Sequence, residues 1–314
     1  MESFRLKVVL AYAAVYLIWG STYLAIRFGV ETLPPFLMAG VRFIVAGSLL
    51  YGLARARGAP NPTRPQWRSL AIIGLLLLVG GNGGVTWAEQ VVPSGITALL
   101  IATTPLWVVL LEWLAPGGRR PGRKVVAGVA LGILGIVVLI GPQQISAERS
   151  FGLLEPAVIV MASLSWAAGS VYSRRADLPG SPFMATAVEM LNGGLALLAL
   201  ATLSGEWGRL ELAAVSLRSA LALLYLIVFG ALIAFTAYIW ILRVSSADKA
   251  ATYAFVNPVV AVFLGWALAD EALGTQTLAA AGIIVAAVFI ITTAKSGFRP
   301  RRRLIAKHEP VSTT

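Results

Sequence analysis

The sequence has no cysteine and a single histidine, His308, which lies in a polar stretch near the C-terminus. Disulfides, thiol nucleophiles and cysteine-ligated metals are therefore excluded, and a zinc site or Ser/His/Asp chemistry lacks the residues it needs. Charged residues are scarce, at 12% of the chain, against roughly one quarter in soluble domains. Because 58% of the 314 residues are apolar, the chain is not a soluble globular protein.

Long apolar runs, broken by charges, proline and glycine, predict the fold class. A membrane-spanning helix needs about 20 apolar residues, so a chain of this length has room for about ten of them and little else. The expected spans are 8–26, 36–54, 70–88, 95–114, 124–140, 153–172, 183–203, 219–242, 249–268 and 276–294. The sequence thus predicts an all-α integral membrane protein with ten transmembrane helices.

The 25 Lys and Arg residues indicate the orientation in the membrane. Apart from Arg42, which lies within a span, all of them except Arg27, Arg149, Arg209 and Arg218 fall on the side of the two termini. The positive-inside rule therefore places both termini in the cytoplasm. We expect the basic cytoplasmic tail, residues 295–314, to contact membrane lipids, and we expect no nucleic-acid partner.

The two halves of the sequence resemble each other. An offset of 147 residues aligns Trp19 with Trp166, Pro35 with Pro182, Phe36 with Phe183 and Gly47 with Gly194, and an offset of 153 aligns Trp87 with Trp240, Pro105 with Pro258 and Trp113 with Trp266. Each predicted half, 8–140 and 153–294, holds five spans. Because five is odd, the second half enters the membrane from the opposite side. Inverted repeats of this kind are typical of transporters.

Proline and glycine near the middle of spans predict hinges at Gly81, Gly83, Pro105 and Pro258. Proline removes a backbone hydrogen bond, a glycine run is a poor helix former, and broken helices near the midplane are where transporters bind substrate. Adjacent polar residues would be costly facing lipid, so we expect three of them at the substrate site: Asn82, Thr104 and Asn257. A packing kink at each proline and tight helix packing along the glycines are the alternative interpretations.

Aromatic residues well inside the spans predict an amphipathic cage for an organic solute. These residues are Trp19, Tyr23, Trp107, Trp166, Tyr238 and Tyr253. The alternative for each is ordinary packing. Two ionisable residues also lie within spans, Arg42 and Glu189, and such residues usually face the protein interior. We expect them at opposite mouths of the pathway, in gating or coupling, with snorkelling toward the headgroups as the alternative.

The sequence Trp19-Gly20-Ser21, followed by Pro35-Phe36, Arg42 and the repeated proline helices, resembles the drug/metabolite transporter superfamily. Within it the chain is similar to the YedA-like branch of the EamA family, over about residues 8–294. Glu271, Gly274 and Gly282 match the family's ending, as do Gly128, Gly132 and Gly135 in the first half, where Gly118 replaces the acid.

The resemblance implies two inverted five-helix bundles around a central cavity, lined mostly by the third, fourth, eighth and ninth spans and by parts of the first and sixth. It also implies efflux or exchange of small metabolites such as amino acids or related compounds. Small multidrug relatives exchange protons through a glutamate in their first helix, and this chain has no acid in the interior of its first or sixth span. Glu189 is the hypothetical substitute, since burial raises the pKa of a carboxylate.

We therefore expect a secondary transporter, not an enzyme, in the bacterial cytoplasmic membrane, acting on a small-molecule substrate without cofactor or metal and as a monomer. The sequence has no Walker-type loop, no cluster of polar nucleophiles and no continuous polar face, which disfavours an ATP-driven pump, a lipid-processing enzyme and a passive pore. A lipid scramblase or a non-transporting scaffold is the alternative that the sequence leaves open.

Overall fold

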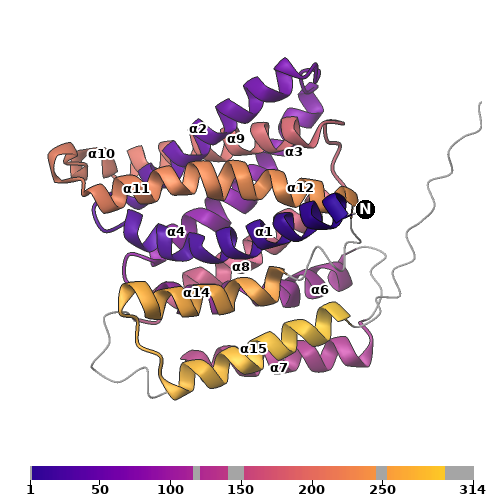
Figure 1. The fold of residues 1–314 in the computed structure, drawn as a ribbon, viewed down its shortest axis with the longest axis vertical. Helices are drawn as coiled ribbons and strands as arrows, with labels where there is room; N and C mark the ends of the chain where they lie inside the picture. The colour runs from indigo at the N-terminus through magenta and orange to yellow at the C-terminus, as the bar shows by residue number, and fades with distance from the viewer. Residues whose placement is uncertain (1, 116–120, 141–151, 245–252, 294–314) are drawn as a thin grey trace, which may run out of the picture.

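The computed structural model describes residues 2–115, 121–140, 152–244 and 253–293, which are helical apart from short connections (Figure 1). Within these residues, seven helical stretches are long and apolar enough to cross a membrane: Phe4–Gly29, Pro35–Ala56, Arg64–Ala88, Ser94–Leu114, Leu154–Ser173, Pro182–Leu203 and Leu217–Tyr238. The predicted all-α membrane architecture is therefore confirmed at this level. The number ten and the inversion of the repeats stay predictions, and the tail 295–314 and the start of the ninth predicted span lie outside the described residues.

The first half of the chain begins with two unbroken helices, α1 (Glu2–Gly29) and α2 (Pro35–Ala56). The third predicted span is continuous but changes its winding at the centre, where a π-helical segment separates two α-helices: α3 (Arg64–Gly74), η1 (Leu75–Gly83) and α4 (Gly84–Ala88). The fourth predicted span is broken into α5 (Ser94–Ile101) and α6 (Thr104–Leu114), and α7 (Arg123–Ile140) follows.

The second half has a similar sequence of elements. It contains α8 (Leu154–Ser173), α9 (Pro182–Leu203), the short α10 (Glu206–Arg209) and the 3-10 turn η3 (Leu212–Ala214). A second π-helical segment then lies between two α-helices: α11 (Leu217–Tyr225), η4 (Leu226–Ile233) and α12 (Ala234–Val244). The last helices are α14 (Tyr253–Ala269) and α15 (Thr275–Thr293).

Local sequence signals explain where several helices begin. Thr63 and Gln66 form a capping box at the start of α3, and the Ser216 hydroxyl accepts the main-chain N–H of Ser219 at the start of α11. Both α2 and α9 have proline in their first turn, where the missing N–H has no partner to lose.

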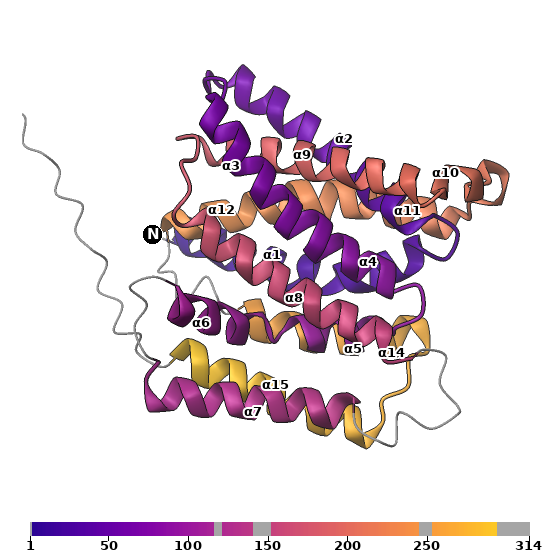
Figure 2. The ribbon, with the colours of Figure 1, turned by 180° about the vertical axis from the view of Figure 1, so that it is seen from behind.

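Glycines bring helices from the two halves into close contact. In Figure 1, α2 and α9 lie together at the top, and α7 and α15 at the bottom; Figure 2 shows α3, α4 and α8 on the opposite side. A Cβ added at Gly47 would lie 3.0 Å from the main-chain oxygen of Ala187 and from Cβ of Met190. Gly128 and Gly135 approach α15 as closely: a Cβ added at Gly128 would lie 2.7 Å from Cγ1 of Ile291, and one added at Gly135 would lie 2.6 Å from Cγ1 of Ile284. The glycine pattern thus serves helix packing.

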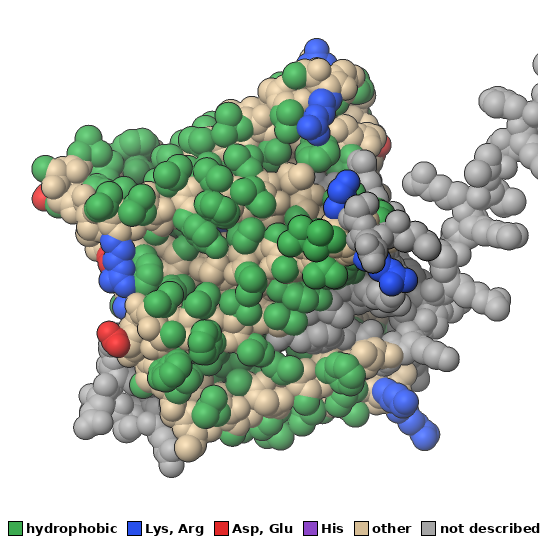
Figure 3. All heavy atoms as spheres, viewed as in Figure 1, with side chains coloured by type: hydrophobic (Ala, Val, Ile, Leu, Met, Phe, Trp, Pro, Cys, Tyr) green, Lys and Arg blue, Asp and Glu red, His purple; other side chains and the backbone are tan. Residues whose placement is uncertain are grey.

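The helix termini define two ends of the molecule. The Arg27 end holds the C-termini of α1, α4, α9 and α14 with the N-termini of α2, α5 and α11, and the Glu112 end holds the C-termini of α6 and α8. Between the ends, large apolar side chains face outward, among them Leu49, Leu195 and Phe263, which are 55–61% exposed. Figure 3 shows this hydrophobic face, with acidic and basic side chains mostly along its margins. A lipid-facing belt accounts for this distribution.

Replacing Gly47 by leucine is expected to destabilise the protein, because overpacking a close helix contact costs about 1–3 kcal/mol. The measurement is the melting temperature in detergent. Gly52→Leu is the matched control, because Gly52 lies on the same helix and an added Cβ there meets no atom within 4 Å. Equal melting temperatures for the two variants would contradict the close contact between α2 and α9.

Candidate functional site

Arg42 lies at the centre of the candidate site, between the two π-helical segments. Its side chain is 6% exposed, and one guanidinium nitrogen donates to Oδ1 of Asn82 in η1 at 3.4 Å. On the other side of Arg42, its Nη2 atom lies 3.3 Å from the position that a Cβ added to Gly230 in η4 would take. The Nε atom of Arg42 is buried without a hydrogen-bond partner. Buried polar groups are normally paired, so this unpaired donor stands out among the described residues.

Glu189 lies on α9, where it is half-buried, and Gly74 of α3 packs against its main-chain oxygen. Within the described part of the chain, neither Arg42 nor Glu189 forms an ion pair, so the two predicted gating residues are not partners of each other. Their expected roles at separate mouths of the pathway stay predictions.

Three predicted substrate-binding aromatics form one cluster. Trp19 lies 5.0 Å from the ring of Tyr238 and 5.2 Å from that of Tyr253, and the last two rings are 5.6 Å apart, nearly perpendicular. The indole N–H of Trp19 donates to the carbonyl of Gly230 at 3.2 Å, which ties this cluster to η4 beside Arg42. Tyr23 lies one turn beyond Trp19 on α1 and packs with Ile101 against the core around Val85.

A second group of predicted residues lies on α6 and α8. The hydroxyl of Thr104 bonds the carbonyl of Ile101 at 2.6 Å and lies 2.9 Å from the Ser163 hydroxyl. Trp107 follows one turn later on α6, and its indole nitrogen is buried without a partner. Trp166 packs on the glycine run, with its ring 2.9 Å from where a Cβ of Gly81 would stand. Asn257 lies with the first group on α14, and its buried Oδ1 has no partner.

The predicted hinge residues differ in their local structure. The helix is interrupted at residues 102–103, immediately before Thr104 and Pro105, whereas α14 continues through Pro258. Gly81 and Gly83 lie in η1 and pack closely on Trp166 and Leu197. Close packing therefore accounts for Gly81 and Gly83 in this structure, in agreement with the alternative interpretation that the glycine run serves tight helix packing. π-Helical segments often occur at functional sites, and η1 and η4 flank Arg42.

The Arg27 end holds a set of polar contacts between the two halves of the chain that sequence reasoning missed. We call them the latch. Glu271 accepts the N–H groups of Ser94 and Gly95 at 2.6 and 3.0 Å, and Glu206, 1% exposed, accepts the N–H of Leu37 at 2.8 Å. Three further contacts complete the latch: Arg218 to Glu31 at 3.3 Å, Ser219 to the Phe28 carbonyl at 2.7 Å, and Ser216 N–H to Thr32 at 3.2 Å.

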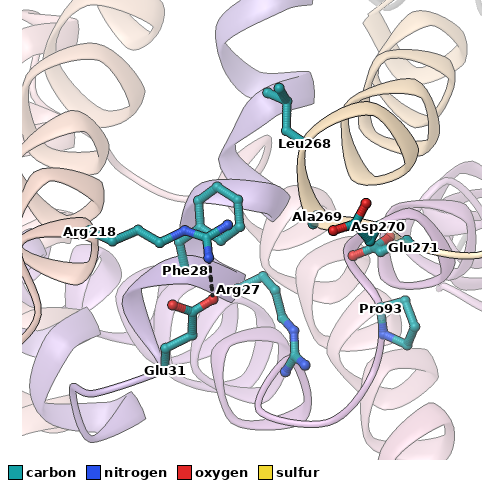
Figure 4. Close-up of a pocket in the computed structure, with 9 residues that line it drawn as sticks. All are labelled: Arg27, Phe28, Glu31, Pro93, Arg218, Leu268, Ala269, Asp270 and Glu271. Atoms are coloured by element: carbon teal, nitrogen blue, oxygen red, sulfur yellow. Dashed lines mark ion pairs between the residues drawn. The ribbon is translucent and has the colours of Figure 1, made fainter.

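A pocket of about 190 Å3 opens beside the latch (Figure 4). Its lining residues are Arg27, Phe28, Glu31, Pro93, Arg218, Leu268, Ala269, Asp270 and Glu271, so none of the predicted substrate-binding residues contributes to it. Arg218 extends over the Phe28 ring toward Glu31, while Arg27 donates to the main-chain carbonyls of Glu89 and Gln90. At the Glu112 end, the described residues provide one ion pair between the halves, Arg174 with Glu112.

A model of one transporter family, the EamA-like transporter family, matches the chain twice, over residues 6–141 and 154–293. The chain belongs to the EamA-like transporter family. It is 43% identical over 295 residues to the inner membrane transporter YedA of Escherichia coli strain K12, covering 93% of this chain and 92% of YedA. It is 26% identical over 292 residues to the transporter YoaV of Bacillus subtilis, covering 91% and 97%.

A crystal structure with 22% sequence identity superposes with a TM-score of 0.61, covering 91% of this chain and 97% of that chain. At this identity the likeness concerns the fold alone. The EamA-like family match confirms the resemblance read from the sequence. The substrate-binding, hinge and gating assignments stay predictions, because sequence similarity of this kind carries no residue roles.

Replacing Glu271 by glutamine is expected to destabilise the protein by about 1–2 kcal/mol, because a neutral amide is a weaker cap for two main-chain N–H groups than a carboxylate. The neighbouring Asp270→Asn variant is the control. Asp270 has a φ of 53°, a conformation that asparagine adopts readily. Thermal unfolding in detergent distinguishes the two, and an unchanged midpoint for Glu271→Gln would contradict the capping role.

Proposed function

We propose that this EamA-like protein is a secondary transporter that exports or exchanges small organic metabolites across the bacterial cytoplasmic membrane. Membership of a transporter family carries the proposal, and the relative named as an inner membrane transporter supports the location. Ten spans in two inverted halves, with both termini in the cytoplasm, are part of the proposal, as is function as a monomer. The paired π-helical segments and the two family matches support the duplication.

Alternating access is the proposed mechanism. The latch joins the two halves at the Arg27 end, and the ion pair of Arg174 with Glu112 joins them at the other. Each contact links helix ends or side chains near the surface, so either set can break while helix packing in the middle persists. Rupture of one set with formation of the other would expose the centre to one side of the membrane at a time.

The proposed substrate class is a zwitterion such as an amino acid or a related compound. Arg42 offers an unpartnered donor to a carboxylate, and the cluster of Trp19, Tyr238 and Tyr253 offers ring faces to an ammonium or an apolar group. Asn82, Thr104, Trp107, Trp166 and Asn257 would supply the remaining polar and aromatic contacts around the same centre. Tyr23 would close the cage toward the Arg27 end.

Proteoliposomes with a mixed pool of amino acids and small metabolites test the function, with and without an imposed pH gradient. We expect at least one zwitterionic solute to be transported by the protein and not by empty vesicles. Movement of a fluorescent lipid between leaflets without movement of any solute would favour the scramblase alternative. Movement of neither would favour a scaffold.

Substitutions at the centre test the substrate site. Arg42→Gln is expected to reduce transport of the zwitterionic solute at least about tenfold, since one charge-assisted hydrogen bond contributes about 1.5–3 kcal/mol. Single alanine substitutions of Asn82, Trp107, Trp166 and Asn257 should change the relative rates of different solutes while the yield of folded protein stays constant. Equal loss of folded protein in all four would favour the packing interpretation.

A further inference from the structure

Glu89 is a fully buried carboxyl group for which the proposed transport mechanism has no role so far. It directly follows α4, so the sequence places it in the five-residue connection between two helices, where a charged residue is ordinarily exposed. In the structure its exposure is 0%, and both carboxyl oxygens are buried without a hydrogen-bond partner. Its main-chain carbonyl, in contrast, accepts from Arg27 at 2.7 Å.

The titratable groups that interact electrostatically with this carboxyl come from α1, α2 and the segment after α14. They are Tyr23 and Arg27 on α1, Arg42 on α2 and Glu271 after α14. Burial raises the pKa of Glu89 well above the usual range, the Glu271 carboxylate raises it further, and the two arginines lower it. Ionisation without a hydrogen bond in an enclosed site is costly, because desolvation of the charge is not compensated.

The position of Glu89 links its protonation to the latch. Arg27 and Glu271 both line the pocket in Figure 4 and both interact with Glu89, which itself does not line the pocket. Glu271 caps the helix that begins at Ser94, a few residues after Glu89. Separation of the two halves at the latch would therefore bring water to the Glu89 carboxyl and allow it to ionise.

We propose that Glu89 is the proton-binding site of this transporter: its carboxyl binds a proton when the Arg27 end closes and releases it when that end opens. The inference rests on the proposed alternating access. A proton taken from the side of the Arg27 end thus stabilises the closed latch, so the pH on that side sets the equilibrium between the closed and the open state. Glu189, on α9, is then a separate group that this coupling does not require.

The sign of the pH dependence follows from linkage. In the open state the Glu89 carboxyl would be exposed to water, where burial no longer raises its pKa above the ordinary value for a glutamate. In the closed state the pKa of Glu89 is higher. As the pH rises above the ordinary value, the closed state therefore loses stability relative to the open state, and the ratio of closed to open molecules falls by up to about tenfold per pH unit. The loss ends once the pH exceeds the raised pKa.

The absence of cysteine from the sequence allows a direct test with single-cysteine variants in lipid nanodiscs. Ser94→Cys places a thiol at a site of 0% exposure under the latch, and its rate of reaction with a charged maleimide reports opening. The reaction of any thiol with maleimide becomes faster as pH rises, because the thiol ionises. The rate of Leu212→Cys, at a position that is 79% exposed, measures this effect, and the rate of Ser94→Cys is divided by it. Rates would be compared between about pH 5 and about pH 8, where a raised carboxyl pKa acts.

We expect the corrected rate of the Ser94→Cys variant to rise with pH, by at least about tenfold over this range. Adding Glu89→Gln, which imitates the protonated form, should keep the rate low at every pH. Adding Glu89→Asp should restore the rise, which separates titration from a structural effect. Glu155→Gln is the matched control, because Glu155 is a partly exposed acid at the start of α8, at the same end of the molecule but outside the latch, and should leave the pH dependence intact.

A rise with pH that persists in the Glu89→Gln protein would overturn the inference, as would a corrected rate independent of pH with Glu89 present. In proteoliposomes, Glu89→Gln should move solute slowly, as the unmodified protein does at low pH, and its transport rate should no longer depend on the pH at the Arg27 end. A transport rate of this variant that still rises with pH at the Arg27 end would contradict the role of Glu89 and leave the transport function standing. Absence of transport by the unmodified protein would instead contradict the proposed function.

Discussion

The structure depends on one constraint: polar groups that are out of water must find partners within the protein. Helix N-termini are the hardest case, because their first N–H groups have no partner within the helix. Two helices of the first half, α2 and α5, solve this with carboxylates from the second half, Glu206 and Glu271. The two halves of the chain are therefore joined by the same bonds that complete their helices.

This arrangement explains how a mostly apolar molecule can hold charges without losing stability. Glu206 and Glu271 are anions placed at the positive ends of helices, where the helix dipole favours them. Glu89 has no such partner, and Arg42 has one long hydrogen bond and a free Nε. Capped charges hold the structure together, and incompletely paired ones are available for ligands and protons. The functional proposals rest on this difference.

The all-α membrane architecture could be predicted from composition and apolar runs, because a helix that faces lipid requires a long, nearly uncharged apolar stretch of sequence. The cluster of Trp19, Tyr238 and Tyr253 was also within reach, since all three lie inside spans. The latch could not be predicted from the sequence, because Glu206 and Glu271 lie in connections between helices. Their partners are main-chain N–H groups, which almost any residue supplies. Burial of Glu89 was equally invisible, as it depends on three-dimensional neighbours from α1, α2 and the end of α14.

The most direct test of alternating access compares distances at the two ends in one preparation. Spin labels at Gln90→Cys and Ala272→Cys, exposed or partly exposed positions beside the latch, report one end, and Leu114→Cys with Arg175→Cys report the other. Pulsed dipolar spectroscopy in nanodiscs, with and without a transported solute, gives both distance distributions. The proposed mechanism predicts that the fraction of long distances rises at one end as it falls at the other. A single unchanged distance at both ends under all conditions would contradict it.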